Sequence, residues 1–169
     1  MLLILLSLAQ ASAATSLRII ERVDPINDSK SFYAVVGDEN QHLAFGCDDV
    51  SARSVRVVAR FNNYIGDSKP GILMGGTDVQ YRFDKRPPVA VRWYSHDREV
   101  SAEAEITRPA RFIQEMKDSR TVYLRATNYD GDSFDMGFSY ENATPIIQQV
   151  LTACGLNADG TRPKTTKAR

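Results

Sequence analysis

Short runs in which apolar and polar residues alternate constrain the fold of this chain more than any other feature. In residues 54–61, alternate positions hold Val55, Val57, Ala59 and Phe61, and the positions between them include Arg56 and Arg60. The apolar side chains would therefore share one face of a β-strand, with the arginines on the other. Similar runs predict strands at residues 16–23, 31–36, 42–47, 79–83, 89–93, 121–127 and 133–139. The last two flank Asp130-Gly131, a dipeptide typical of tight turns, and are predicted to form a hairpin.

Two segments have helical periodicity instead. The first spans residues 107–118, with Pro109 in its first turn and its apolar side chains in one stripe. The second has Thr144 as its N-cap and Pro145 as its first helical residue, and it ends at Gly155. Because the helices come late and singly, the sequence predicts a β-rich α+β fold: an antiparallel sheet or sandwich with two packed helices.

The overall composition is that of one globular domain. The 169 residues include 21 basic and 21 acidic side chains, and 43% are hydrophobic. This balanced charge argues against nucleic-acid binding, which normally requires a basic excess. The predicted domain covers residues 14–155. Residues 156–169 combine Gly, Pro, Thr and basic residues without an apolar period, so they are predicted to be a disordered basic tail.

The amino terminus has the pattern of a signal peptide. Residues 2–8 are almost entirely apolar but too few to span a bilayer, and Ala9, Ala11 and Ala13 follow at the spacing that signal peptidase recognises. The expected signal peptide therefore covers residues 1–13. The mature protein is expected in the periplasm or outside the cell, without stable membrane insertion after cleavage.

The chain has two cysteines, Cys47 and Cys154. An even count in an exported chain favours a disulfide between them, and two buried free thiols are the alternative. The sequence contains neither a C-x-x-C pair nor a Cys/His cluster, so no zinc site or thioredoxin-like redox centre is expected.

No constellation in the sequence indicates catalysis. A hydrolytic triad would need His42 or His96 as its base, and no G-x-S-x-G turn occurs. The acidic residues around Gly131 lack the spacing and the closing Glu of an EF-hand, and the glycines of residues 71–76 lack the Lys of a phosphate-binding loop. The chain is therefore expected to be non-enzymatic and to use no cofactor or metal.

Two features are candidates for contact with a partner protein. Ile72, Leu73 and Met74 form an apolar stretch in a loop that precedes a predicted strand. Arg82 and Arg92 lie in the middle of predicted strands, where arginine usually faces solvent. We therefore expect these five residues to contribute to a contact surface.

Pairing across the sheet is the alternative for the arginines in mid-strand, which also include Arg125. Asp84 and Asp135 are the acidic residues that such an arginine would meet. The same two aspartates are the pair that a cell-wall enzyme or carbohydrate binder would bring together in a cleft. A role as a cell-wall enzyme or carbohydrate binder is the weakest of the functional hypotheses that the sequence suggests.

The order of several segments carries a family resemblance. They are Asp24-Pro-Ile-Asn-Asp-Ser-Lys30, Leu43-Ala-Phe-Gly-Cys47, Val79-Gln-Tyr-Arg-Phe-Asp84, residues 134–138 and the helix that ends at Cys154. Together they resemble the type VI secretion-associated VasI/TagO-like family of exported bacterial proteins, over residues 19–155. Asn27 and Gly46 depart from the family's pattern. The resemblance implies an exported, disulfide-linked, β-rich accessory domain without established catalytic residues.

These features lead to two expectations for function. The first is an exported periplasmic accessory protein that binds an envelope or secretion-apparatus component and is not an enzyme. The alternative is a secreted inhibitor or a phage-derived exclusion factor that acts on a lysozyme or a surface receptor. The alternative would use the loop of residues 71–78 to plug the cleft of its target.

Overall fold

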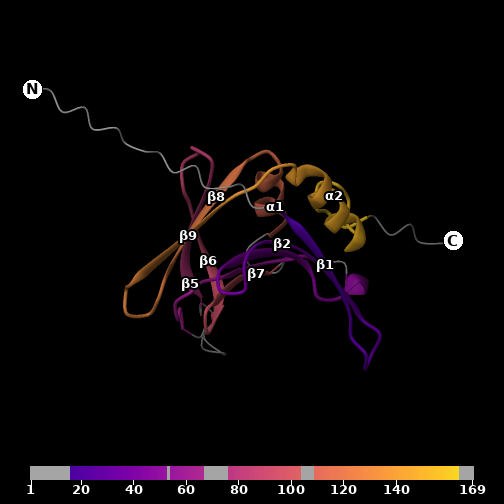
Figure 1. The fold of residues 1–169 in the computed structure, drawn as a ribbon, viewed down its shortest axis with the longest axis horizontal. Helices are drawn as coiled ribbons and strands as arrows, with labels where there is room; N and C mark the ends of the chain where they lie inside the picture. Colours follow the sequence, from indigo (N-terminus) through magenta and orange to yellow (C-terminus); the bar gives the residue numbers. More distant parts are fainter. Residues whose placement is uncertain (1–15, 53, 67–75, 104–108, 164–169) are drawn as a thin grey trace, which may run out of the picture.

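A computed structural model of the chain describes residues 16–52, 54–66, 76–103 and 109–163. Within these residues, nine strands form one antiparallel sheet in the order β1-β2-β3-β4-β7-β6-β5-β8-β9 (Figure 1). The strands are β1 (Arg18–Val23), β2 (Lys30–Gly37), β3 (His42–Cys47), β4 (Arg56–Arg60), β5 (Thr77–Phe83), β6 (Val89–His96), β7 (Glu99–Glu103), β8 (Thr121–Thr127) and β9 (Ser133–Ser139). The helices are α1 (Pro109–Lys117) and α2 (Ala143–Ala153), and a short 3-10 helix, η1 (Val50–Ala52), follows β3. The predicted β-rich α+β class is confirmed.

The sheet is strongly bent, and both helices lie on the same side of it (Figure 1). The bend brings the turn between β2 and β3 to β9, where the Gln41 side-chain amide donates a hydrogen bond to the Asp135 carbonyl at 3.5 Å. Gly37, with φ 107°, lies so close to the Phe138 ring that a β-carbon there would be 2.8 Å from it. The bend therefore gives the sheet an inner face that encloses the core and an outer face.

The core fills the space between the inner face and the helices. Val55, Val57, Ala59 and Phe61 are all buried, so the predicted apolar face of residues 54–61 is confirmed. The helices contribute Phe112, Ile113, Met116, Ile147, Val150 and Leu151. On the opposite face of β2, β3 and β4, a second small cluster contains Val35, Ala44 and Val58.

Of the nine strands, β7 is the one that the sequence did not predict. Strand β6 runs on to His96, the chain turns at Asp97 with φ 53°, and β7 returns between β6 and β4. This strand has only one large apolar side chain, Val100, which is fully buried. Strand β7 is held by its pairing with β4 on one side and β6 on the other. The residue pattern within the segment does not reveal those partner strands.

The end of α2 agrees with the sequence, but its start does not. Gly155, with φ 67°, follows the helix as predicted. The N-cap position belongs to Asn142, with φ 54°, rather than to Thr144. The Thr144 hydroxyl instead donates to the Lys117 carbonyl at 3.2 Å. It thereby satisfies a free carbonyl at the end of α1 and joins the two helices.

A disulfide joins the sheet to α2. Cys47 is the last residue of β3, Cys154 directly follows α2, and their Cα atoms are 5.9 Å apart. Both residues are buried, at 1% and 0% exposure. The predicted Cys47–Cys154 pairing is confirmed, and the alternative of two free thiols is excluded.

Residues 156–163 are ordered against α1, so the prediction of a disordered tail from residue 156 was wrong for this part. Leu156 is buried, and the Gln114 side-chain amide of α1 donates to the Ala158 carbonyl at 2.7 Å. The Asn157 N–H donates to the Thr161 carbonyl at 2.9 Å and closes a turn. The apolar Leu156 and this turn hold the segment in place. Residues 164–169 and the predicted signal peptide, residues 1–13, lie outside the described residues.

Candidate functional site

Strands β6, β5, β8 and β9 present a polar surface on the side away from the core, which we call the outer face. Alternation along each strand points these side chains outward, because their neighbours Val79, Tyr81 and Leu124 are buried. Strand register aligns the outward residues in three rows across the sheet. The rows are Arg92, Asp78, Thr127 and Ser133; Ala90, Gln80, Arg125 and Asp135; and Arg82, Tyr123 and Gly137.

A groove of about 630 Å³ crosses this surface, and we call it the outer groove. It extends from Gln41, in the turn between β2 and β3, to Pro88, in the turn between β5 and β6. Between these ends it is lined by outward residues of β5, β8 and β9, namely Gln80, Arg82, Tyr123, Arg125, Asp135 and Gly137. The groove therefore combines charged and amide side chains with the exposed aromatic ring of Tyr123.

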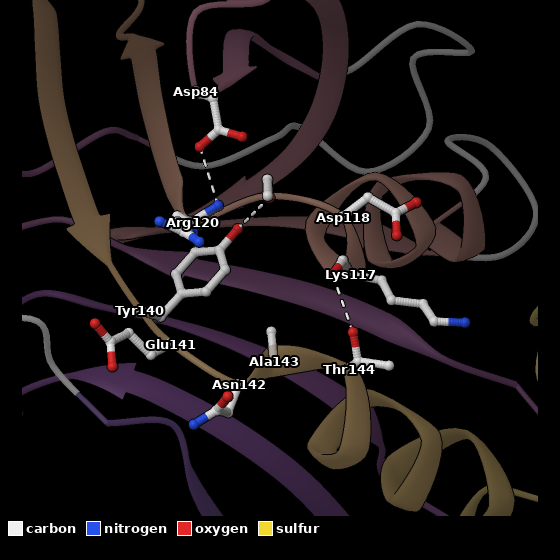
Figure 2. A pocket seen from close by; sticks show the side chains of 10 residues that line it. Asp84, Lys117, Asp118, Arg120, Tyr140, Glu141, Asn142, Ala143 and Thr144 are labelled. Carbon is white, nitrogen blue, oxygen red and sulfur yellow. Dashed lines mark hydrogen bonds between the residues drawn. The ribbon is translucent and has the colours of Figure 1, made fainter.

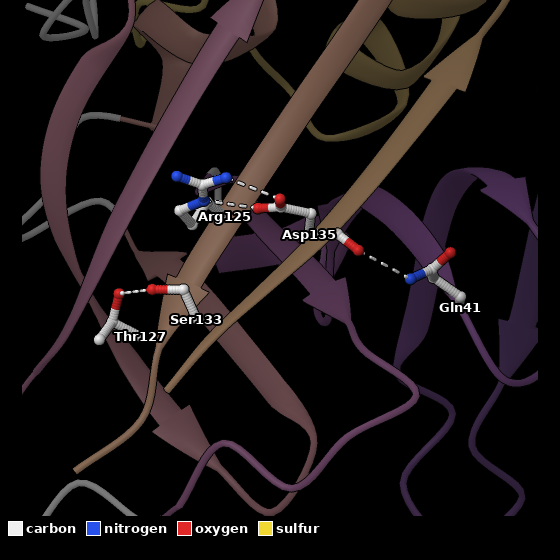
Figure 3. Close-up of polar contacts among 5 residues, drawn as sticks. All are labelled: Gln41, Arg125, Thr127, Ser133 and Asp135. Carbon is white, nitrogen blue, oxygen red and sulfur yellow. Dashed lines mark hydrogen bonds and ion pairs between the residues drawn. The ribbon is translucent and has the colours of Figure 1, made fainter. Parts of the chain in front are cut away.

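The lining of the outer groove includes a bidentate ion pair, shown in Figure 3. The Arg125 guanidinium donates to both oxygens of Asp135, at 2.6 and 2.7 Å. This contact lowers the pKa of Asp135 and raises that of Arg125. Beside it, the hydroxyls of Thr127 and Ser133 are 3.0 Å apart across the same two strands. The pairing of a mid-strand arginine with Asp135, an alternative from the sequence, is therefore present.

A second arginine of the outer face is also matched by an aspartate. Arg92 Nε lies 3.4 Å from Asp78, and its Nη2 donates to the Gly76 carbonyl at 2.6 Å. Both side chains are more than half exposed, so the pair contributes little to stability. It nevertheless balances the charge of Arg92.

The third arginine, Arg82, contacts an aromatic ring instead. Its guanidinium carbon lies 5.1 Å from the centre of the Tyr123 ring, within the range of a cation–π interaction. On the other side of β8, Tyr123 faces Gly137, where a β-carbon would lie 2.7 Å from the ring. The glycine thus leaves room for the tyrosine to lie across β9.

A second hollow, of about 600 Å³, lies where three turns meet and is shown in Figure 2. Its polar groups largely satisfy one another. The buried Tyr140 hydroxyl is 2.6 Å from the Ser119 hydroxyl, and burial raises the pKa of Tyr140. Asp84 accepts hydrogen bonds from the N–H groups of Arg120 and Thr121 at 3.0 and 2.9 Å, and from the Thr121 hydroxyl at 3.1 Å. These contacts fix the turns, so we assign this hollow a structural role.

Asp84 makes the stability of the fold depend on pH. Burial raises the pKa of Asp84, but the hydrogen bonds from Arg120 and Thr121 outweigh it and lower this pKa overall. A carboxyl whose pKa is lower in the folded state stabilises the fold above about pH 4, and the stabilisation is lost as the pH falls further. In urea unfolding from about pH 5 to 2, Asp84→Asn should therefore lose less stability than the unsubstituted protein.

The matched control for this experiment is Asp130→Asn. The Asp130 carboxylate lies in an exposed turn, and among the described residues it accepts no hydrogen bond. This variant should follow the pH profile of the unsubstituted protein. If Asp84→Asn follows it as well, the proposed contribution of Asp84 is wrong.

The structure brings some of the sequence candidates together and separates others. Arg82 and Arg92 share the outer face. The apolar loop candidates lie outside the described residues; they are Ile72, Leu73 and Met74. Asp84 and Asp135 line different hollows, so they do not converge as the two carboxylates of a cleft. Within the described residues, no group of three or more His, Cys, Asp or Glu residues is placed to hold a metal ion.

Sequence reasoning missed the residues that shape the groove around Arg82. Tyr123 and Gly137 face each other across β8 and β9, and the hairpin centred on Asp130-Gly131 sets that register. The turn was predicted from the sequence. Pairing residues at equal distances on either side of the turn would therefore have placed Tyr123 opposite Gly137. Gln41 comes from a turn that is distant in the sequence and adjacent only because the sheet bends.

We compared the chain with protein-family models, curated proteins and solved structures, and none of them matches. None of the helices among the described residues is long and apolar enough to cross a membrane.

Proposed function

We propose that this chain is an exported, non-enzymatic accessory protein that binds another component of the cell envelope or of a secretion apparatus. The observation that carries the proposal is the outer face, where Arg82, Arg92, Arg125 and Tyr123 are exposed on three neighbouring strands, β6, β5 and β8. Arginine and tyrosine are enriched in protein interfaces and in the residues that dominate binding energy there. We therefore place the contact surface on the outer face.

The rigidity of this surface supports a role in binding. Each of its residues belongs to a strand that is hydrogen-bonded within the sheet, and the buried side chains between them anchor the strands to the core. Side chains on a fixed backbone lose less conformational freedom when a partner binds. A preformed surface of this kind suits recognition of a folded or extended protein.

The disulfide supports the export part of the proposal. Bonds such as Cys47–Cys154 persist in the periplasm and outside the cell and are rare in the cytosol. The pattern of residues 1–13 points to the same compartment. The resemblance to the VasI/TagO-like family suggests that the partner belongs to a type VI secretion system or to a related envelope assembly.

Site-specific photocrosslinking tests the proposed contact surface. Tyr94, 38% exposed, follows Arg92 on the same side of β6 and is replaced by p-benzoylphenylalanine, which preserves an aromatic ring. The control carries the same group in place of Gln149, an exposed residue of α2. Illumination of intact cells should give an adduct with an envelope or secretion component from position 94 and none from position 149.

Charge reversal on the outer face then checks the specificity of the adduct. Arg92→Glu in the position-94 protein should reduce its yield several-fold, because like charges placed opposite one another disfavour association. An adduct of equal yield from positions 94 and 149, or no envelope adduct from either, would contradict the proposed surface.

A further inference from the structure

We infer that the outer groove binds a short, extended, acidic segment of the partner protein, with one carboxylate of that segment held by Arg82. This inference rests on the proposed function, because it names the chemistry of the partner that the outer face recognises. Three observations carry it: the charge balance of the groove, the contact of Arg82 with the Tyr123 ring, and the span of the three strands that the groove crosses.

Charge balance singles out Arg82. Arg125 is paired with Asp135 and Arg92 with Asp78, so these four side chains contribute no net charge to the surface. Among the described residues, no carboxylate lies within ion-pair distance of Arg82. A positive charge that is unmatched within a groove favours a negatively charged group of a partner.

The environment of Arg82 also suits the binding of a carboxylate from a partner protein. Its guanidinium lies over the Tyr123 ring at cation–π distance, which restricts a side chain that would otherwise lose rotamer freedom on binding. Gly137 leaves the space in which that ring lies. A planar guanidinium held in this way can donate two parallel hydrogen bonds to one carboxylate. The Arg125–Asp135 pair in the neighbouring row has this geometry.

The dimensions of the groove set the length of the bound segment. The groove crosses β5, β8 and β9, and neighbouring strands lie about 4.8 Å apart. These three strands alone therefore span about 10 Å, which an extended peptide covers with roughly three to four residues. The exposed amide of Gln80, on β5, can donate to and accept from the backbone of such a segment.

Peptide binding to the disulfide-bonded protein tests the inference. The probe is a fluorescein-labelled peptide with three consecutive glutamates flanked by glycines, and the matched probe has glutamine in their place. Fluorescence anisotropy should show binding of the glutamate peptide only, and the affinity should weaken as salt rises to about 0.15 M. Arg82→Gln should weaken binding about tenfold. Arg111→Gln removes the same charge from the exposed surface of α1, away from the outer face, and should change binding less than about twofold.

Two further measurements test whether Arg82 itself contacts the peptide. Arg82→Lys keeps the charge but loses the planar fork, so it should restore only part of the affinity. The Arg82 Nε–Hε signal in NMR spectra should shift when the glutamate peptide is added. Equal effects of Arg82→Gln and Arg111→Gln, or equal binding of the two peptides, would overturn the inference.

A neutral sugar oligomer, chitotetraose, is the competing ligand, because tyrosine and amide side chains also line carbohydrate sites. Binding of chitotetraose without binding of the glutamate peptide would overturn the inference in favour of a glycan. Crosslinking from position 94 is independent of these probes. If crosslinking succeeds and the glutamate peptide does not bind, the acidic segment is wrong while the proposed contact surface stands.

Discussion

Reduction of the Cys47–Cys154 disulfide is expected to lower the free energy of unfolding by about 4–5 kcal/mol. The two cysteines are 107 positions apart in the sequence, and a cross-link of that span removes much of the conformational freedom of the unfolded chain. Domains of this size are typically stable by only 5–15 kcal/mol. The loss is therefore a large part of the total stability.

The position of the bond adds a local effect. It fastens the end of α2 to the end of β3, and α2 packs on α1 through the hydrogen bond from Thr144 to the Lys117 carbonyl. A helix of 11 residues has little stability of its own. After reduction, α2 should lose protection from amide hydrogen exchange before the strands do.

Urea unfolding with and without a thiol reductant measures the global effect. The unsubstituted protein should unfold at a much lower urea concentration in the reductant. A protein with Cys47→Ala and Cys154→Ala should resemble the reduced protein and should not respond to the reductant. If the oxidised and reduced proteins unfold at the same urea concentration, the disulfide does not stabilise the fold as we expect.

The sequence predicted those elements whose pattern is complete within the element itself. Strands β3, β8 and β9 have the predicted bounds, because each is a compact run ended by turn residues. Strand β7 escaped prediction because its hydrogen-bonding partners, rather than its side chains, define it. The N-cap of α2 was misplaced for a related reason, since the Thr144 hydroxyl bonds to another helix instead of its own.

The same distinction applies to the candidate site. Strand alternation was enough to predict that Arg82 and Arg92 face solvent. That Arg82 meets Tyr123 depends on the pairing of β5 with β8, which are separated in the chain by β6, β7 and α1. Local patterns do not specify which distant strands become neighbours. The groove is therefore a property of the sheet order, which the sequence pattern left open.

Replacement of Phe112 by alanine is the second change for which we expect a large effect. Its ring lies in the core between α1 and the sheet, with ring centres 4.9 Å from Tyr81, 5.0 Å from Phe83 and 5.6 Å from Trp93. The side chain is 2% exposed. Removal of a buried aromatic ring leaves a cavity that the rigid sheet cannot close, and typically costs about 3–5 kcal/mol.

Arg111→Ala, one position earlier on α1, is the matched control. Arg111 is exposed, and its ion pair with Glu115 at 2.8 Å lies on the helix surface, so its loss should leave the urea concentration at the midpoint of unfolding almost unchanged. Urea unfolding of both variants, with near-ultraviolet circular dichroism of Trp93 as a second readout, separates the two effects. A cost below about 1 kcal/mol for Phe112→Ala would mean that the site collapses around the smaller side chain. In that case α1 would not be held on β5 and β6 by this aromatic cluster, and the outer face would lack the rigid support from beneath that we assign to it.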